Sequence, residues 1–213
     1  QELLRWAQEV PARVILEDDY DSEFRFVGRP IPTLFSIDGG EQVVYLNTFS
    51  KTIAPSIRIS FMVLPRRLLA DFRQKLGFYA CTVSAFEQYT LAQFLAGGWY
   101  EKHLSRMRKH YRQKRDAVIA AVYKSPLAPY AAITEEDAGL HFLLRLDGAP
   151  PDEVLRGEAE QRGIRLAMLS DYYQRPQDAP QHVLVVNYTG IDLDRLPAAL
   201  ERLAALWKEN DHV

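Results

Sequence analysis

Two short segments of the chain hold the residue types that group-transfer chemistry uses. Residues 17–24 read EDDYDSEF and residues 48–58 read TFSKTIAPSIR. Together they supply carboxylates, a phenol, hydroxyls, a lysine amine and a guanidinium group. A lysine amine can form a Schiff base with an aldehyde, and a carboxylate can hold a protonated ring nitrogen. Thr48, Ser50 and Arg58 could bind a phosphate through hydroxyl donation and guanidinium pairing.

Each of these segments follows a short apolar run that is typical of a buried strand, at residues 14–16 and 43–46. Parallel strands that are covered on both faces show such runs. In open α/β sheets, ligands bind beyond the carboxyl ends of the strands. The two segments are therefore expected around one crevice, and their combined chemistry meets the requirements of pyridoxal 5′-phosphate.

The remaining apolar pattern predicts an α/β protein with a smaller second region. A third strand is expected at residues 59–64. Before Pro126, helices are expected at residues 1–10, 66–76, 84–96 and about 100–123. After Pro126, strands are expected at 140–146, 164–167 and 183–186, and helices at 151–162 and 192–208. We predict a sheet domain over residues 1–98, a long linking helix over 99–124 and a small α+β domain over 125–213.

Composition limits the class of protein. With 47% hydrophobic and 25% charged residues, the 213-residue chain is typical of a globular protein and not of a disordered one. The net charge of −2 lacks the basic excess of an isolated nucleic-acid-binding domain. A single cysteine, Cys81, cannot form an internal disulfide or a cysteine-based metal cluster, so no metal site is expected; we interpret Cys81 as a buried small residue. Apolar runs are too short to span a membrane, and a cytoplasmic location is expected.

The motifs resemble a known family. Residues 17–24, Thr48-Phe49-Ser50-Lys51-Thr52, Ala54-Pro55-Ser56 and Arg58 are similar to fold-type I pyridoxal-phosphate-dependent aminotransferases. Within them, the chain looks most like the aminotransferase-like domain of MocR/GabR-type transcription regulators of the GntR family. The likeness continues at Glu87-Gln88, residues 103–108, Ala138–His141 and residues 187–191. The resemblance implies the C-terminal part of such a transferase: part of the large, mostly parallel sheet domain, the linking helix and the small domain.

The resemblance also implies roles for individual residues. Lys51 would be the catalytic lysine that forms the internal aldimine with pyridoxal phosphate. Asp18 would pair with the pyridinium nitrogen, and Tyr20 would hydrogen-bond the phenolic oxygen of the cofactor. The phosphate would be bound by Thr48, Ser50 and Arg58.

Two departures from the family pattern bear on activity. Aminotransferases of this fold carry an arginine in a late strand that binds the substrate carboxylate, and this position is Val185 here, beside Val186. No arginine occurs between Arg175 and Arg195. In addition, the family's glycine-rich phosphate loop, ring-stacking aromatic residue and asparagine precede the first helix found here. The chain begins with Gln1 inside an amphipathic segment, so we expect it to be a piece of a longer protein.

These observations leave three interpretations. The first is an effector-sensing and dimerisation domain of a regulator, in which a small amino compound or pyridoxal phosphate itself is the effector. DNA would then be bound only through an N-terminal domain absent from this chain. The second is an active aminotransferase that acts on an amino acid. The third is a degenerate dimerisation module. The resemblance implies a homodimer, and no membrane partner is expected.

Other residues have plainer explanations. Asp19, Asp21 and Glu23 are interpreted as structural or surface acids, and His103 as a residue that packs or pairs. His141 is interpreted as a core histidine. A cluster of basic residues on the long helix is interpreted as a solvated or interdomain face rather than a nucleic-acid patch; it consists of Arg106, Arg108, Lys109, Arg112, Lys114 and Arg115.

Overall fold

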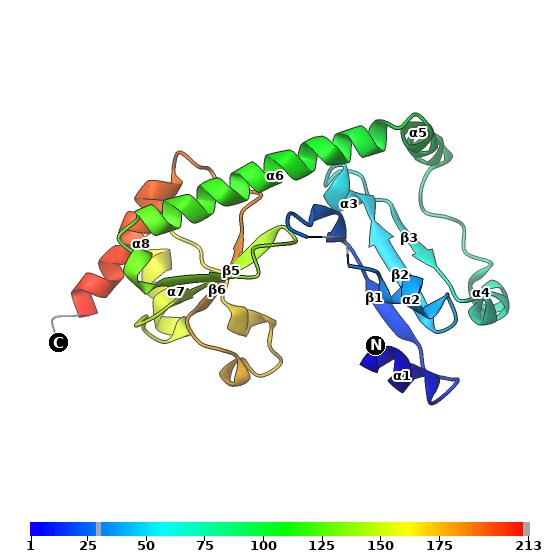
Figure 1. Cartoon of the computed structure of the whole chain (residues 1–213), viewed down its shortest axis with the longest axis horizontal. Coiled ribbons are helices and arrows are strands. Elements are labelled where there is room, and N and C mark those ends of the chain that lie inside the picture. Colours follow the sequence, from blue (N-terminus) through cyan, green and yellow to red (C-terminus); the bar gives the residue numbers. More distant parts are fainter. Residues whose placement is uncertain (29–30, 211–213) are drawn as a thin grey trace. The chain divides into compact units, whose positions relative to one another are not determined.

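The computed structural model describes residues 1–28 and 31–210, which form two compact units (Figure 1). The first unit comprises Gln1–Glu23 and Gly28–Met107, and the second comprises Phe24–Val27 and Arg108–Val213. The boundary falls inside the long helix α6 (Trp99–Lys124), which was expected to be a separate linking helix over residues 99–124. The second unit also gains residues 24–27, which are remote from the rest of it in sequence.

The first unit is built on a three-stranded sheet in the order β1-β2-β3 (Figure 1). Strand β1 (Ile15–Asp18) pairs in parallel with β2 (Val43–Thr48), with Ile15 opposite Val43 and Asp18 opposite Leu46. Strand β3 (Ser60–Val63) pairs with β2 in the antiparallel direction. The three strands expected from the sequence are therefore present. The carboxyl ends of β1 and β2 meet at one edge of the sheet.

The expectation that the first two strands are buried is wrong for β1, and β3, for which no burial was expected, is exposed as well. Leu16 in β1 is 69% exposed, and every residue of β3 is exposed. Only the central strand has a buried apolar core, at Val43 and Val44. The reason is positional, because β1 and β3 are the two edge strands of the sheet that the described residues form.

Short helices surround this sheet in the first unit. Three of them were expected: α1 (Glu2–Gln8), α4 (Leu69–Leu76, after a 3₁₀ turn at Arg66–Leu68) and α5 (Ala85–Ala96). Two were not, α2 (Leu34–Asp38) and α3 (Phe49–Thr52). Both are too short to show helical periodicity, and both start at a threonine whose hydroxyl accepts a backbone N–H, as an N-cap does.

Helix α5 carries apolar and polar side chains without a separate apolar face, and none of its residues is buried. Phe86 and Tyr89 are 80% and 73% exposed. A surface helix typically turns a stripe of apolar side chains toward a core, and α5 has no such stripe. Cys81, which precedes α5, is also exposed, so its interpretation as a buried residue was wrong. The whole stretch from residue 70 to 82 is exposed, so there is no core around Cys81 for it to enter.

The second unit contains an antiparallel sheet in the order β4-β5-β6. It is formed by β4 (Ala131–Thr134), β5 (His141–Leu146) and β6 (Val183–Asn187). Helices α7 (Asp152–Gln161) and α8 (Leu196–Asn210) complete it, with 3₁₀ turns at Ala128–Tyr130, Leu169–Tyr172 and Pro176–Asp178. This matches the expected small α+β region.

The core of the second unit lies between its sheet and its helices. Phe142 and Tyr188 are fully buried and stack with ring centroids 6.2 Å apart. Further core side chains come from five elements of the unit: Val118 and Val122 of α6, Leu144 and Leu146 of β5, Leu155 and Ala159 of α7, Val183 and Leu184 of β6, and Leu200, Leu203 and Leu206 of α8.

Three expectations for this unit need correction. Residues 164–167 do not form a strand. The Val185 N–H donates to the Ala167 carbonyl, and an isolated bridge joins the next residue, Met168, to Leu184. Strand β4 was missed. Helix α8 begins at Leu196 rather than at residue 192, because the Asp192 carboxylate accepts the Asp194 N–H in a turn that precedes the helix.

The basic residues on α6 include three that are used within the second unit. Arg112 donates to the Phe26 carbonyl (2.8 Å), Lys114 to the Thr189 carbonyl (2.7 Å) and Arg115 to the Glu136 carbonyl (2.7 Å). These bonds explain half of the cluster as structural. Among the described helices, none combines the length and the apolar character that crossing a membrane would need.

Candidate functional site

Thr48, Ser50 and Arg58 come together at the carboxyl end of β2. The Thr48 hydroxyl lies 3.2 Å from the Ser50 hydroxyl, and Arg58 Nη1 donates to the Ser50 hydroxyl at 3.2 Å. The Thr48 hydroxyl also donates to the Ile59 carbonyl (3.1 Å), and the Ser50 hydroxyl donates to the Ile57 carbonyl. These bonds fold the chain from residue 57 to 59 back onto α3. The Arg58 guanidinium group suits an anion such as a phosphate, and the two hydroxyls can donate to the same anion if they turn from their carbonyl acceptors.

Lys51 lies in the middle of α3, between Ser50 and Thr52. Its side chain is exposed, and within the described part of the chain its amine makes no hydrogen bond or ion pair. The turn itself is held firmly: Thr52 is buried, and His103 Nε2 donates to the Thr52 carbonyl at 3.0 Å. Phe49 packs edge-on against Tyr100 with ring centroids 5.9 Å apart. The geometry therefore presents an accessible amine on a fixed backbone.

Asp18 and Tyr20 lie at the carboxyl end of the neighbouring strand β1. Asp18 is the last residue of β1 and pairs with Leu46, two residues before Thr48. Successive side chains of a strand point to opposite faces of the sheet, so Asp18 shares a face with Leu46 and not with Asp19. Both Asp18 and Tyr20 are exposed. The parallel pairing of β1 with β2 thus brings all six predicted residues to one edge of the sheet.

The acids beside Asp18 serve the fold. Glu17 accepts the backbone N–H groups of Leu34 and Phe35 at 2.7 and 2.9 Å, so its carboxylate holds the start of α2. A negative group is favourable at a helix N-terminus. Asp19 accepts the Tyr45 hydroxyl at 2.8 Å. The acidic run therefore contains two carboxylates engaged with the protein and one, Asp18, that faces solvent on the other side of the strand.

Tyr45 and Asn47 of β2 were not among the predicted site residues. Asn47 Nδ2 donates to the Tyr45 hydroxyl (2.8 Å) and to Glu23 Oε1 (3.2 Å). Burial is the main cause that raises the pKa of Tyr45 to about 12, and burial also raises the pKa of Glu23. Alternation in the sequence puts Tyr45 and Asn47 on one face of β2 and Glu17 and Asp19 on one face of β1. That the two faces coincide follows only from the register of the strands, which pairs Glu17 with Tyr45.

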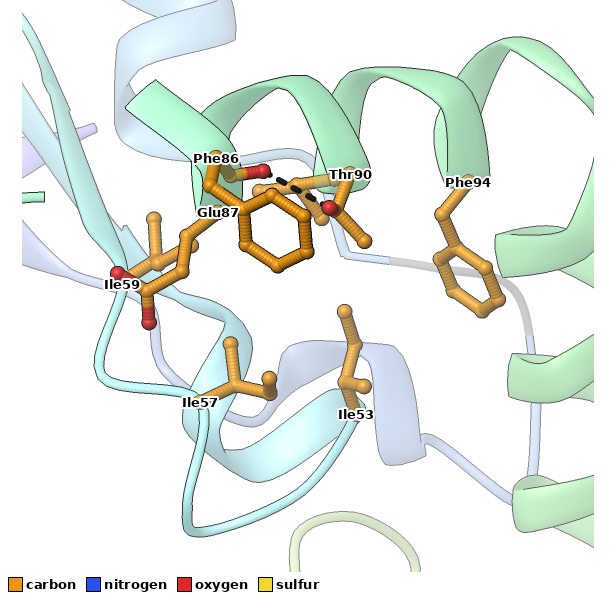
Figure 2. A pocket seen from close by; sticks show the side chains of 8 residues that line it. Ile53, Ile57, Ile59, Phe86, Glu87, Thr90 and Phe94 are labelled. Atoms are coloured by element: carbon orange, nitrogen blue, oxygen red, sulfur yellow. Dashed lines mark hydrogen bonds between the residues drawn. The ribbon is translucent and has the colours of Figure 1, made fainter. Parts of the chain in front are cut away.

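An apolar hollow of about 310 Å³ lies beside residues 53–59, which follow α3 in the first unit (Figure 2). Figure 2 shows the side chains of Ile53 and Ile57 facing helix α5, which contributes Phe86 and Phe94. The Thr90 hydroxyl is turned to its own helix, where it donates to the Phe86 carbonyl at 2.8 Å. The lining thus offers apolar packing rather than groups for a charged ligand. It consists of Ile53, Ile57, Ile59, Phe86, Glu87, Thr90, Leu91 and Phe94.

The late-strand position that the sequence analysis examined lies in β6 of the second unit. Val185 and Val186 are half-buried there, and Val186 pairs with Phe142 of β5. Neither valine can form the ion pair that an arginine would make with a carboxylate. Within residues 1–28 and 31–210, no three His, Cys, Asp or Glu side chains gather as a metal ion would require.

Comparison with known proteins finds transcription regulators similar in sequence and aminotransferases similar in structure. No protein-family model matches the chain. Over 207 residues it is 37% identical to the uncharacterized HTH-type transcriptional regulator YdeL of Bacillus subtilis, with 97% of this chain and 44% of that protein covered. It is 38% identical over 179 residues to the probable rhizopine catabolism regulatory protein MocR of Rhizobium meliloti, with 84% and 36% covered.

Among solved structures, the chain is similar to the kynurenine aminotransferase of Pyrococcus horikoshii. The TM-score is 0.82 at 27% identity, with 100% of this chain and 52% of that one covered. The chain has the fold of the C-terminal part of a fold-type I pyridoxal-phosphate-dependent transferase. In sequence, the chain resembles MocR-type transcription regulators. It spans less than half the length of the two regulators and about half that of the aminotransferase.

Proposed function

We propose that the chain binds pyridoxal 5′-phosphate through Lys51 and is the effector-sensing part of a MocR-type transcription regulator. The main support for this proposal is the group of residues at the carboxyl end of β2. There the accessible amine of Lys51 adjoins a hydrogen-bonded cluster formed by Thr48, Ser50 and Arg58. Asp18 and Tyr20 at the same sheet edge support it. The similarity to two regulators over most of this chain favours a regulator.

The residues divide the binding work by their chemistry. When bound, the cofactor supplies an aldehyde that takes up an amine, together with an electron-withdrawing ring. The Lys51 amine anchors the aldehyde carbon. Asp18 holds the proton on the ring nitrogen, and the Tyr20 hydroxyl donates to the phenolic oxygen. Arg58, with Ser50 and Thr48, holds the phosphate by charge-assisted hydrogen bonds.

An active aminotransferase is the second candidate. It is favoured by the likeness to the Pyrococcus horikoshii enzyme, whose structure is described in complex with PMP. The valine at position 185 argues against it for ordinary α-amino acids, because an arginine pairs with a carboxylate through two parallel hydrogen bonds and a valine cannot. The proposed regulator would be a homodimer that responds to a small amino compound or to the cofactor itself. DNA contact would come from a further domain.

The first experiment is an absorbance titration of the purified protein with pyridoxal 5′-phosphate, in wild type, Lys51→Ala and Lys75→Ala. Lys75 is an exposed lysine of α4 in the same unit and serves as the control. We expect a saturable new band, fixed by borohydride, in wild type and Lys75→Ala but not in Lys51→Ala. A band of equal size in Lys51→Ala would refute the proposed anchor.

Two further arms extend the titration. Arg58→Ala should weaken cofactor binding by about 10- to 100-fold, since hydrogen bonds to charged groups contribute about 1.5–3 kcal/mol. Arg58→Lys should recover only part of the lost cofactor affinity, because lysine lacks the planar guanidinium that can donate two parallel hydrogen bonds to a phosphate. Adding amino acids to the loaded protein then separates the candidates: a spectral change without keto-acid release indicates a sensor, and sustained release with a keto-acid acceptor indicates an aminotransferase.

A further inference from the structure

The segment that follows β1 is fastened to β2 at both of its ends. At one end, the Tyr45 hydroxyl donates to Asp19 Oδ2 at 2.8 Å. At the other, Asn47 Nδ2 donates to Glu23 Oε1 at 3.2 Å, and it also donates to the Tyr45 hydroxyl at 2.8 Å. The four side chains thus form one continuous hydrogen-bonded chain. We call the group Asp19, Glu23, Tyr45 and Asn47 the β2 clamp.

The two β2 members of the clamp are themselves held in place. Asn47 is only 7% exposed. The ring of Tyr45 contacts those of Phe35 and Phe61, with centroids 6.0 and 6.2 Å apart. Burial raises the pKa of Tyr45 to about 12, so its hydroxyl stays protonated and remains a donor at neutral pH. Because the ring is fixed and the hydroxyl stays protonated, Tyr45 holds the Asp19 carboxylate in one position through this hydrogen bond.

The clamp encloses the residues that are proposed to face the cofactor ring. Tyr20 lies between the two attachment points Asp19 and Glu23, and Asp18 immediately precedes the first of them. Because strand side chains alternate, the clamp residues lie on one face of the sheet and Asp18 projects from the other. The clamp therefore fixes the backbone beneath the site without occupying it.

We propose that the β2 clamp positions Asp18 and Tyr20 for the ring of bound pyridoxal phosphate, an inference that rests on the proposed function. A binding residue must be held within about 0.5 Å of its productive position, and packed neighbours with their own hydrogen bonds provide this. Tyr45 and Asn47 are positioning residues, since they act through the segment that they hold.

The test compares Tyr45→Phe with wild type and with Tyr89→Phe in the complete gene product that contains this chain. Tyr45→Phe removes one oxygen and keeps the ring that packs on Phe35 and Phe61, while Tyr89 is 73% exposed and serves as the control. Cofactor affinity is measured by absorbance titration, and the pH at which the cofactor band titrates is measured as well. Amide hydrogen exchange of a peptide spanning residues 16–24 reports the mobility of the segment in the cofactor-free protein.

We expect Tyr45→Phe to weaken cofactor binding by about 5- to 20-fold, to shift the pH midpoint of the band and to speed exchange in residues 16–24. A second pair covers the case that Tyr45→Phe does not fold: Asp19→Ala should behave like Tyr45→Phe, whereas Asp19→Asn, which keeps an acceptor oxygen, should bind nearly as wild type. If cofactor affinity and the pH midpoint of the cofactor band are unchanged in Tyr45→Phe and Asp19→Ala, even with faster amide hydrogen exchange, the positioning role is overturned. The proposed function would still stand. If the wild type forms no borohydride-fixed band, the proposed function itself fails.

Discussion

Glu17, Asp18 and Asp19 are adjacent and chemically alike, yet their surroundings differ. Glu17 holds the N–H groups of Leu34 and Phe35, and Asp19 accepts the hydroxyl of Tyr45. Asp18 alone projects from the other face into solvent. The alternation of a strand separates the residues available to a ligand from those that maintain the fold. A carboxylate at position 18 is therefore free to interact with a ring nitrogen.

Tyr45 should make stability depend on pH in the alkaline range. Its pKa is raised from 10.0 to about 12, mainly by burial, so the folded state favours the neutral phenol. The stabilisation is fully present below pH 10 and is lost as the pH rises toward 12. Between these values, the free energy of unfolding should fall more steeply in wild type than in Tyr45→Phe. Urea unfolding at pH 9, 10, 11 and 12 measures this, with Tyr89→Phe as control; parallel curves would contradict it.

At the residue scale, the six proposed ligand residues could be named from the sequence because their types and spacing are unusual together. Tyr45 and Asn47 could not. A tyrosine and an asparagine in a strand are common, and their importance depends on register: only the parallel pairing of β1 with β2 places Tyr45 opposite Glu17 and beside Asp19. A contact between residues 26 positions apart, such as Asp19 and Tyr45, leaves no local pattern in the sequence.

At the scale of elements, the start of α5 is defined by a reciprocal cap. The Ser84 hydroxyl accepts the Glu87 N–H at 3.2 Å, and the Glu87 carboxylate accepts the Ser84 N–H at 3.4 Å. Ser84→Ala should lower the free energy of unfolding by about 0.5–2 kcal/mol. Ser84→Asp should retain most of it. Denaturant unfolding measures both, and Ser105→Ala on the exposed surface of α6 should change little; equal losses at Ser84 and Ser105 would argue against the cap.

Long periodic elements were predicted well, and short or edge elements were not. Helices α5 and α6 have bounds within one residue of those expected, because several turns of pattern define them. The expected strand at residues 164–167 has the apolar alternation of a strand, but it makes only isolated contacts with β6. Strand β4 was missed because four residues carry too little pattern.

For the molecule as a whole, the two units differ in how their apolar side chains are packed. The second unit has a closed core in which Leu155 of α7 is fully buried, while the adjacent Val154 is 47% exposed. Leu155→Ala should lower the free energy of unfolding by about 2–5 kcal/mol. Val154→Ala should cost far less, since it leaves no cavity. Urea unfolding compares the pair, and similar losses from the two substitutions would contradict the assigned core.

The overall class of fold followed from the order of elements and from two motifs, but the extent of each unit did not. Residues 24–27 belong with the second unit because Phe26 N–H bonds to the Asp137 carbonyl and the Phe24 ring meets that of Tyr111 at 5.1 Å. Contacts between residues that are about 90 to 110 positions apart are set by tertiary packing, and a linear reading assigns such a segment to its sequence neighbours.

The alternation of side chains along β1 also limits which sequence changes this segment can accept during evolution. A substitution at residues 15–20 alters one side chain on one face. A deletion or insertion of a single residue there would rotate every later side chain to the other face. After a deletion, Asp19 would take the place of Asp18, and the hydroxyl of Tyr45 would lose its acceptor. Between the start of β1 and Glu23, related proteins should therefore differ by substitutions and not by insertions or deletions. Alignment gaps should occur in the loop that follows.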